Sequence, residues 1–246
     1  MSAAWSYFWW VILPYVAMAV FILGHIWRWR YDQFGWTSYS TELQEHKRLK
    51  WGGPLFHYGT FAAIGGHVIG ILIPESWINA IGINESVYHL FAAAAGLLAA
   101  GLVILGVGIL ATRRLFVPRV RAQTSKVDWV ALIALGVMVG LGIAVTAINA
   151  PMGFDYRSTI AVWFRGLFAG NASVSLAEQA PVVFQVHAVA AWVLFLLWPF
   201  TRLVHAWSYP LWYLWRPYIV YRSKRAGHPN EPGTGGRKWR RIGTPY

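Results

Sequence analysis

Long apolar runs alternate with short polar connections along most of the chain. Five runs are long enough to cross a membrane, because a helix needs about 20 mostly apolar residues to span roughly 30 Å of hydrocarbon. They cover residues 5–27, 54–73, 88–112, 128–148 and 182–204. Pro14, which lacks an N–H, is expected to bend the first helix. The pattern therefore predicts an all-α integral membrane protein built as a bundle of five transmembrane helices.

The distribution of charge gives these helices a direction. Of the 21 Lys and Arg residues, all but Arg157 and Arg165 lie in alternate connections, at residues 28–50, 113–126 and 202–246. Basic connections stay in the cytoplasm, so we expect the N-terminus outside and the C-terminus in the cytoplasm. The first helix carries no signal-cleavage pattern and should remain in the mature protein. The net charge of +12 thus reflects topology, and no nucleic-acid partner is expected.

Composition agrees with a membrane location and limits the cofactors. The chain is 57% hydrophobic and only 12% charged, unlike a soluble domain. It contains no cysteine, which excludes disulfides, thiolate-bound iron–sulfur clusters and covalently attached c-type haem within this chain. Any metal cofactor must therefore be held by His, Met or oxygen ligands.

The chain is expected to divide into two parts. Residues 1–221 form the five-helix membrane domain, and residues 222–246 form a basic tail rich in Gly and Pro. The tail cannot bury a core, so we expect it to be mobile in the cytoplasm until it meets lipid or a partner. In the outer connection at 150–181, the stretch TIAVWFRGLF either lies along the membrane surface, covers an outer site, or simply joins two helices.

Four histidines lie in or at the ends of two predicted spans, where an ionisable side chain indicates function. The second span, PLFHYGTFAAIGGHVIGILIP, contains His57 and His67, and the fifth, FQVHAVAAWVLFLLWPFTRLVHAW, contains His187 and His205. The first two are ten residues or roughly 15 Å apart along a helix, and the second two eighteen residues or roughly 27 Å. Because the helices run in opposite directions, depth matches His57 with His205 on the cytoplasmic side and His67 with His187 on the outer side.

Such imidazole pairs predict haem. Two imidazoles from facing helices, without a nearby carboxylate or thiolate, suit a haem that supplies four nitrogens better than they suit zinc or non-haem iron. A haem with both axial positions filled transfers electrons and leaves no vacancy for a substrate. We therefore expect two b haems, with irons roughly 20 Å apart, that form a relay across most of the bilayer.

Several neighbouring residues have two interpretations. The glycines of the second span either let a porphyrin approach the backbone or serve helix packing: Gly59, Gly65, Gly66 and Gly70. Arg202 is expected either to pair with a haem propionate or to lie among lipid headgroups. His89, at the outer start of the third span, either accepts a proton from a quinol or caps the helix in water.

The remaining histidines are not expected to bind a cofactor. His25 has no partner at matching depth, so we expect it to be hydrogen-bonded within the protein. His46 and His228 lie in polar segments and should be solvated.

The most specific motifs are LFHYG and GGHVIG in the second span, RRLFVPRVRA in the second cytoplasmic loop, and FQVHAVAAW and FTRLVHAWSYP around the fifth. Over nearly all of residues 5–221 the chain resembles the gamma subunit of respiratory nitrate reductases, a five-helix dihaem cytochrome b of the cell membrane. The resemblance implies that His57 and His205 hold the haem nearer the cytoplasm, and His67 and His187 the outer haem.

The resemblance also implies a quinol:nitrate oxidoreductase. In this family quinol is oxidised near the outer haem, its protons leave to the outside, and electrons pass inward to an iron–sulfur beta subunit and a molybdenum-containing alpha subunit that reduces nitrate. Gly66 and His67 match the quinol-site pattern. That pattern includes a lysine at the outer start of the third span, where residues 84–89 contain none, so His89 becomes a further candidate. The basic loop and tail are expected to face the soluble partners.

Two rival functions are distinguishable. A related dihaem cytochrome b serving another quinol-linked complex, such as sulfite or heterodisulfide reduction, would share the four ligands and differ in its copurifying subunits. A transporter with a histidine-lined path is disfavoured, because the spans lack acidic residues and discontinuous repeats.

Overall fold

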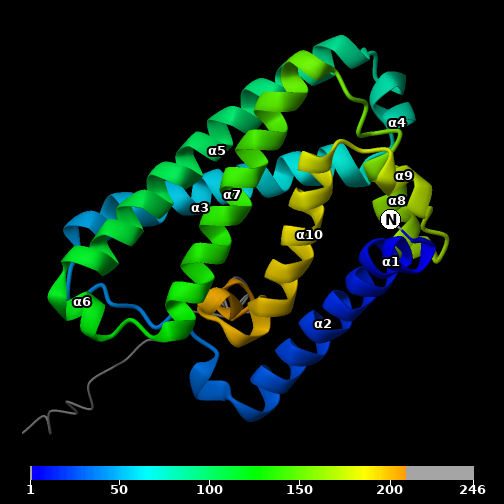
Figure 1. Ribbon diagram of the computed structural model, residues 1–246. Helices are drawn as coiled ribbons and strands as arrows, with labels where there is room; N and C mark the ends of the chain where they lie inside the picture. The colour runs from blue at the N-terminus through cyan, green and yellow to red at the C-terminus, as the bar shows by residue number, and fades with distance from the viewer. Residues whose placement is uncertain (1, 209–246) are drawn as a thin grey trace, which may run out of the picture. The chain divides into compact units, whose positions relative to one another are not determined.

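The computed structural model describes residues 2–208, whose regular elements are all helical (Figure 1). Five helical segments are long and apolar enough to cross a membrane: Ala3–Tyr31, Lys47–Leu72, Glu85–Phe116, Lys126–Met152 and Val182–Phe200. This confirms the predicted all-α membrane fold with five transmembrane helices. The predicted tail at 222–246 lies outside the described residues, and the orientation of the termini stays a prediction.

Two of the spans contain a wider π-helical turn. The first span consists of α1 (Ala3–Tyr7), a π turn (Phe8–Ile12) and α2 (Leu13–Tyr31). Pro14 is the second residue after this turn, and the altered hydrogen-bond pattern accommodates its missing N–H. The second span consists of α3 (Lys47–His67) and the π turn η3 (Val68–Leu72).

The third and fourth spans are the continuous helices α5 and α7, and short helices lie between the spans. The two long helices are α5 (Glu85–Phe116) and α7 (Lys126–Met152). The short helices in the connections are α4 (Glu75–Ala80), α6 (Pro118–Ala122), α8 (Ile160–Ala169) and α9 (Val174–Glu178).

The fifth span ends earlier than predicted. α10 (Val182–Leu197) leads into a 3₁₀ turn (Trp198–Phe200), and a separate 3₁₀ segment, η5 (Arg202–Ala206), follows. Between them Thr201 has an extended backbone, with φ −116° and ψ 177°. The expected continuous helix over 182–204 is therefore wrong, because Pro199 supplies no N–H for it. His205 lies on η5 and does not share a helix with His187.

The spans pack in a defined order. α3 lies along α5, α5 along α7, α7 along α10, and α10 along α2 (Figure 1). Glycines allow the closest of these contacts: a Cβ on Gly59 would lie 2.8 Å from the backbone N of Val103. A Cβ on Gly106 would lie 2.4 Å from the backbone N of Phe56. Close packing on α5 thus fixes α3, which carries two of the four histidines.

Buried ion pairs gather the basic connections at one end of the bundle. Arg113, at the end of α5, is 3% exposed and donates Nε–H to Glu45 at 2.7 Å. Its other nitrogens donate to the Thr41 side chain and to the backbone carbonyls of Thr41 and Glu45, each at 2.8 Å. Arg113 therefore attaches the α2–α3 connection to α5. We call this end the basic end, and the opposite end, which contains α4, α8 and α9, the far end.

An aromatic core closes the far end. Trp163 of α8 is 1% exposed and donates its indole N–H to the carbonyl of Trp10 at 2.9 Å. Arg165 donates to the carbonyl of Ile71 at 2.7 Å, and so joins α8 to the end of the second span. The TIAVWFRGLF stretch is therefore a packed helix of the core and more than a simple connection.

Candidate haem sites

Two pairs of imidazoles form between α3, which carries His57 and His67, and the segments α10 and η5, which carry His187 and His205. The ring centroids of His57 and His205 are 5.9 Å apart, with an angle of 77° between the ring planes. Those of His67 and His187 are 6.1 Å apart, with an angle of 30°. The structure thus brings together the same partners that matching by depth suggests. We call them the basic-end pair and the far-end pair.

The spacing within each pair suits a single metal. An imidazole nitrogen binds a metal at about 2 Å, so two imidazoles on opposite sides of one metal have ring centroids about 6 Å apart. Within residues 2–208 no group of three or more His, Asp or Glu side chains could hold a metal ion. Two protein nitrogens are the donor set that a haem requires, because its porphyrin supplies the other four. The residues present therefore fit two haems.

Three of the four imidazoles, those of His57, His67 and His205, are fixed through Nδ1. Each Nδ1 lies between 2.6 and 2.8 Å from a backbone carbonyl oxygen three or four residues earlier. Because a carbonyl only accepts, Nδ1 carries the proton and Nε2 keeps the lone pair that binds a metal. His187 differs, since its Nδ1 is buried and has no hydrogen-bond partner among the described residues.

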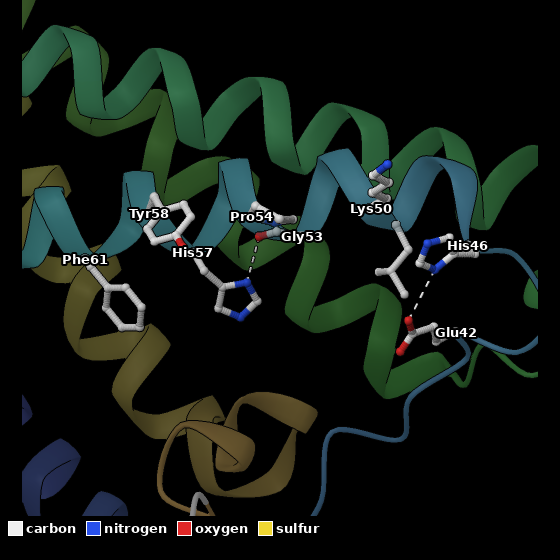
Figure 2. Close-up of a pocket in the computed structure, with 9 residues that line it drawn as sticks. Glu42, His46, Lys50, Gly53, Pro54, His57, Tyr58 and Phe61 are labelled. Carbon is white, nitrogen blue, oxygen red and sulfur yellow. Dashed lines mark hydrogen bonds and ion pairs between the residues drawn. The ribbon is translucent and has the colours of Figure 1, made fainter.

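A pocket of about 460 Å³ opens beside His57. In Figure 2, His57 and Phe61 project from the same side of α3, and the Glu42–His46 pair lies toward the start of that helix. The volume falls in the range of cofactor sites. Its polar mouth is formed by His46 and Glu42, whose Nδ1 and Oε1 are 3.2 Å apart. The His46 side chain is 64% exposed, as expected for a solvated residue.

An ion pair that the sequence did not suggest positions the other imidazole of the basic-end pair. Arg202 donates Nε–H to Asp128 at 2.6 Å, and the carbonyl of Arg202 accepts from Nδ1 of His205 at the same distance. Burial, together with nearby His57, lowers the pKa of His205 and keeps the imidazole neutral. Arg202 therefore pairs with a carboxylate of the protein, which neither earlier interpretation of this residue had considered.

Asp128 is itself firmly held at the start of α7. Its side chain is 9% exposed and forms a capping box with Ser125. Its second carboxylate oxygen lies 3.9 Å from the Arg114 guanidinium. The expectation that the spans lack acidic residues is therefore wrong at this position. An acidic residue two positions after the loop RRLFVPRVRAQTSK was the signal that could have revealed it.

The glycines of the second span divide into two kinds. Gly59 is a packing glycine, because a Cβ there would strike the α5 backbone. A Cβ on Gly65 or Gly66 would meet nothing within 4 Å. The quinol-site candidates Gly66 and His67 therefore lie on an open face of α3, where a bound group can approach the backbone.

A polar cluster lies beside the far-end pair. The hydroxyls of Tyr88 and Tyr156 are 3.0 Å apart, and each lies 3.1 Å from where a Cβ on Gly70 would be. His89, the third quinol-site candidate, packs edge-on against Tyr156 and places Nε2 3.1 Å from Glu85. Sequence reasoning named His89. It missed Tyr156 and Arg157, which reach the cluster from the α7–α8 connection.

His25 is not part of either pair. Its Nδ1 lies 2.6 Å from the carbonyl of Phe21, and the rings of Trp36 and Trp207 lie edge-on to it. This agrees with the expected hydrogen-bonded position within the protein. His228 lies outside the described residues.

Comparison with known proteins identifies the family. The pattern of the "Nitrate reductase gamma subunit" family matches residues 6–224. The "Nitrate reductase gamma chain" of Bacillus subtilis is 47% identical over 216 residues, which are 87% of this chain and 97% of that protein. The "Respiratory nitrate reductase 1 gamma chain" of Escherichia coli is 34% identical over 87% of this chain and 95% of its own length.

A longer relative contains the same unit. The "Nitrate reductase-like protein NarX" of Mycobacterium tuberculosis is 40% identical over 87% of this chain, but the match covers only 33% of that protein. The matches to the two gamma chains, by contrast, run over nearly their full lengths. This chain therefore belongs to the nitrate reductase gamma subunit family, and it is a multi-pass membrane-anchor cytochrome b subunit of that oxidoreductase complex.

Proposed function

We propose that this chain oxidises a membrane quinol beside the far-end pair and delivers the electrons to partner subunits at the basic end. The proposal includes two b haems, one between His57 and His205 and one between His67 and His187. The observation that carries it is the pair of imidazole separations, 5.9 and 6.1 Å, each suited to one iron. A haem with two axial imidazoles supplies one-electron transfer without a site for substrate at the iron.

The direction of flow follows from the two ends of the bundle. The basic connections favour a cytoplasmic location for the basic end and an outer location for the far end. Electrons then pass inward to an iron–sulfur beta subunit, and nitrate is reduced in a molybdenum-containing alpha subunit. Open space over Gly66 and the adjacent His67 supports a quinol site beside the far-end pair.

Family membership disfavours the two rival functions. A cytochrome of sulfite or heterodisulfide reduction would share the imidazole pairs, but the two relatives aligned over nearly their full lengths are gamma chains of nitrate reductases. A histidine-lined transporter has no need of imidazoles held at the spacing of a shared metal.

The test is to count b haems in the purified complex of wild-type protein and of separate His67→Ala and His205→Ala variants. We expect two haems per chain in the wild type and about one in each variant, with a different redox component lost each time. His46→Ala is the control, because His46 is mostly exposed and belongs to neither pair. A wild type without haem, or variants that keep both haems, would contradict the proposal.

A further inference from the structure

The proposed quinol oxidation releases two protons, and the structure contains a polar chain that leads away from the far-end pair. It begins at the hydrogen-bonded hydroxyls of Tyr88 and Tyr156, which lie against Gly70. Gly70 is three residues beyond His67. The Tyr156 ring also stacks on Phe184 at 6.3 Å, three residues before His187. The tyrosine pair therefore lies about one helical turn beyond the two imidazoles.

The next member of the chain is His89. Its ring centroid lies 6.1 Å from that of Tyr156, and its Nε2 lies 3.1 Å from Oε1 of Glu85. No hydrogen bond from Nδ1 of His89 to a carbonyl is formed in the described part of the chain, in contrast to the three tethered imidazoles of the metal pairs. His89 thus has one nitrogen toward a carboxylate and the other free.

Glu85 connects the cluster to the surface. Its Oε1 is buried and accepts no aligned hydrogen bond, although His89 Nε2 is close. The same residue lines a pocket of about 360 Å³ with Asn79, Gly82, Ile83 and Asn84 at the far end of the bundle. Glu85 therefore has a free acceptor atom near His89 and lies at the edge of space that water can enter.

Arg157 keeps this carboxylate in place. It is a cation whose side chain is 1% exposed, and NH1 donates to Glu85 Oε2 at 3.1 Å. The guanidinium carbon lies 4.1 Å from the Tyr88 ring centroid, a cation–π contact. The buried guanidinium thus holds the Glu85 carboxylate in place and contacts the face of the Tyr88 ring.

Charged and polar groups from two parts of the chain face His89. Besides Glu85 and Tyr88 on its own helix, it faces Tyr156, Arg157 and Asp155 from the α7–α8 connection. Despite partial burial, hydrogen bonds from Ser158 and the Arg157 backbone lower the pKa of Asp155, which adds a second carboxylate. Burial and the bond with Tyr88 raise the pKa of Tyr156, so it orients hydrogen bonds as a neutral phenol.

We propose that His89 and Glu85 form the proton exit of the quinol site, a step that rests on the function proposed above. Nδ1 of His89 accepts the proton of a quinol hydroxyl while Nε2 passes its proton to Glu85. Glu85 then releases the proton to water in the adjoining pocket, and the imidazole returns to its first tautomer. Each O–H bond broken in the quinol is balanced by one proton delivered to water, and the two electrons leave through the proposed relay.

The experiment uses the purified complex and compares two electron donors. In Glu85→Gln, the rate of haem reduction by duroquinol should fall about tenfold or more, because an amide cannot accept the proton from His89. Nitrate reduction driven by a reduced viologen dye and the haem content should stay at wild-type values. Glu75→Gln is the matched control, since Glu75 lies on neighbouring α4 and, within residues 2–208, accepts a side-chain hydrogen bond from Asn79 alone.

A second variant tests the same proton exit in case Glu85→Gln fails to fold. His89→Gln leaves the Arg157–Glu85 ion pair intact and should slow duroquinol oxidation to a similar extent. Wild-type duroquinol rates in both variants, with full haem content, would overturn the proton exit and leave the proposed function standing. A wild-type complex that holds no haem or does not oxidise duroquinol would instead refute the proposed function itself.

Discussion

The basic-end and far-end pairs have similar ring separations but different surroundings. In the basic-end pair both imidazoles are tethered through Nδ1, and His205 is held by a short helix that the Asp128–Arg202 ion pair anchors. In the far-end pair His187 has no Nδ1 partner among residues 2–208, and a cluster of tyrosines, His89 and Glu85 lies beside it. One site is restrained on both sides, whereas the other adjoins groups that can exchange protons.

This difference matches the two tasks of the proposed relay. A site that only passes electrons needs fixed ligands, because fixed orientation keeps reorganisation small. A site next to quinol must also handle protons, which requires titratable groups and a route to water. The predictions below test whether the two sites differ in this way.

The largest effect is expected from Asp128→Asn. Removal of this carboxylate leaves Arg202 and Arg114 without their buried partner and should cost about 3 kcal/mol of stability. Because Arg202 also supplies the carbonyl that orients His205, we expect the basic-end haem to be lost or to shift in midpoint potential. The far-end haem should be unchanged. A spectroscopic redox titration and a thermal denaturation curve measure the two effects.

Asp32→Asn is the control for that variant. Asp32 forms an ion pair with Arg28 on the same end of the bundle, but its side chain is 40% exposed. An exposed pair contributes at most about 1 kcal/mol. Equal effects of the two substitutions on the basic-end haem would show that Asp128 has no special part in holding His205.

The second prediction compares two glycines of α3. A methyl group at Gly59 would lie 2.8 Å from the backbone N of Val103, so Gly59→Ala should destabilise the fold by about 1–3 kcal/mol. Gly66→Ala meets no atom within 4 Å and should leave the melting temperature of the haem-free chain unchanged. If a bound quinol lies over Gly66, the same variant should raise the KM for duroquinol. Equal loss of stability in both variants would show that the face of α3 at Gly66 is packed and has no open space for a ligand.

The third prediction concerns pH at the basic end. Glu45 is partly desolvated, but hydrogen bonds from the Arg48 backbone and from Arg113 lower its pKa below the ordinary value of 4.5. A carboxylate with a depressed pKa stabilises the fold fully above the unfolded value and loses that contribution as pH falls through the folded value. The free energy of unfolding of the wild type should therefore exceed that of Glu45→Gln at pH 7 by on the order of 1 kcal/mol. Denaturation curves recorded at falling pH should show this difference in stability disappear in acid. A stability difference that does not change with pH would contradict this role of the Glu45 carboxylate.

The smallest effect is spectroscopic. The ring planes are 77° apart in the basic-end pair and 30° apart in the far-end pair. Near-perpendicular axial imidazoles leave the iron d orbitals closer in energy, so the oxidised basic-end haem should show the larger g anisotropy by electron paramagnetic resonance. Loss of the more anisotropic signal in His205→Ala, and of the other in His67→Ala, checks the assignment. Identical signals would remove this distinction between the sites.

Much of the site could be read from the chain because it depends on regular helices. The depth of His67 and His187 follows from 1.5 Å of rise per residue once the spans are placed. The prediction for His205 rested on a helix that ends at Leu197, yet its ring still lies 5.9 Å from that of His57. The break at Thr201 therefore did not separate His205 from His57.

The sequence by itself determined the five spans, the lack of cysteine ligands and the four histidines, because hydrophobic length and helical rise are local properties. The tertiary structure alone decided how Asp128 holds Arg202 and how Tyr156 and Arg157 reach Tyr88, Glu85 and His89. These contacts join residues that are 68 to 74 positions apart. No local pattern encodes which helix ends meet, since that depends on the packing of whole spans against one another.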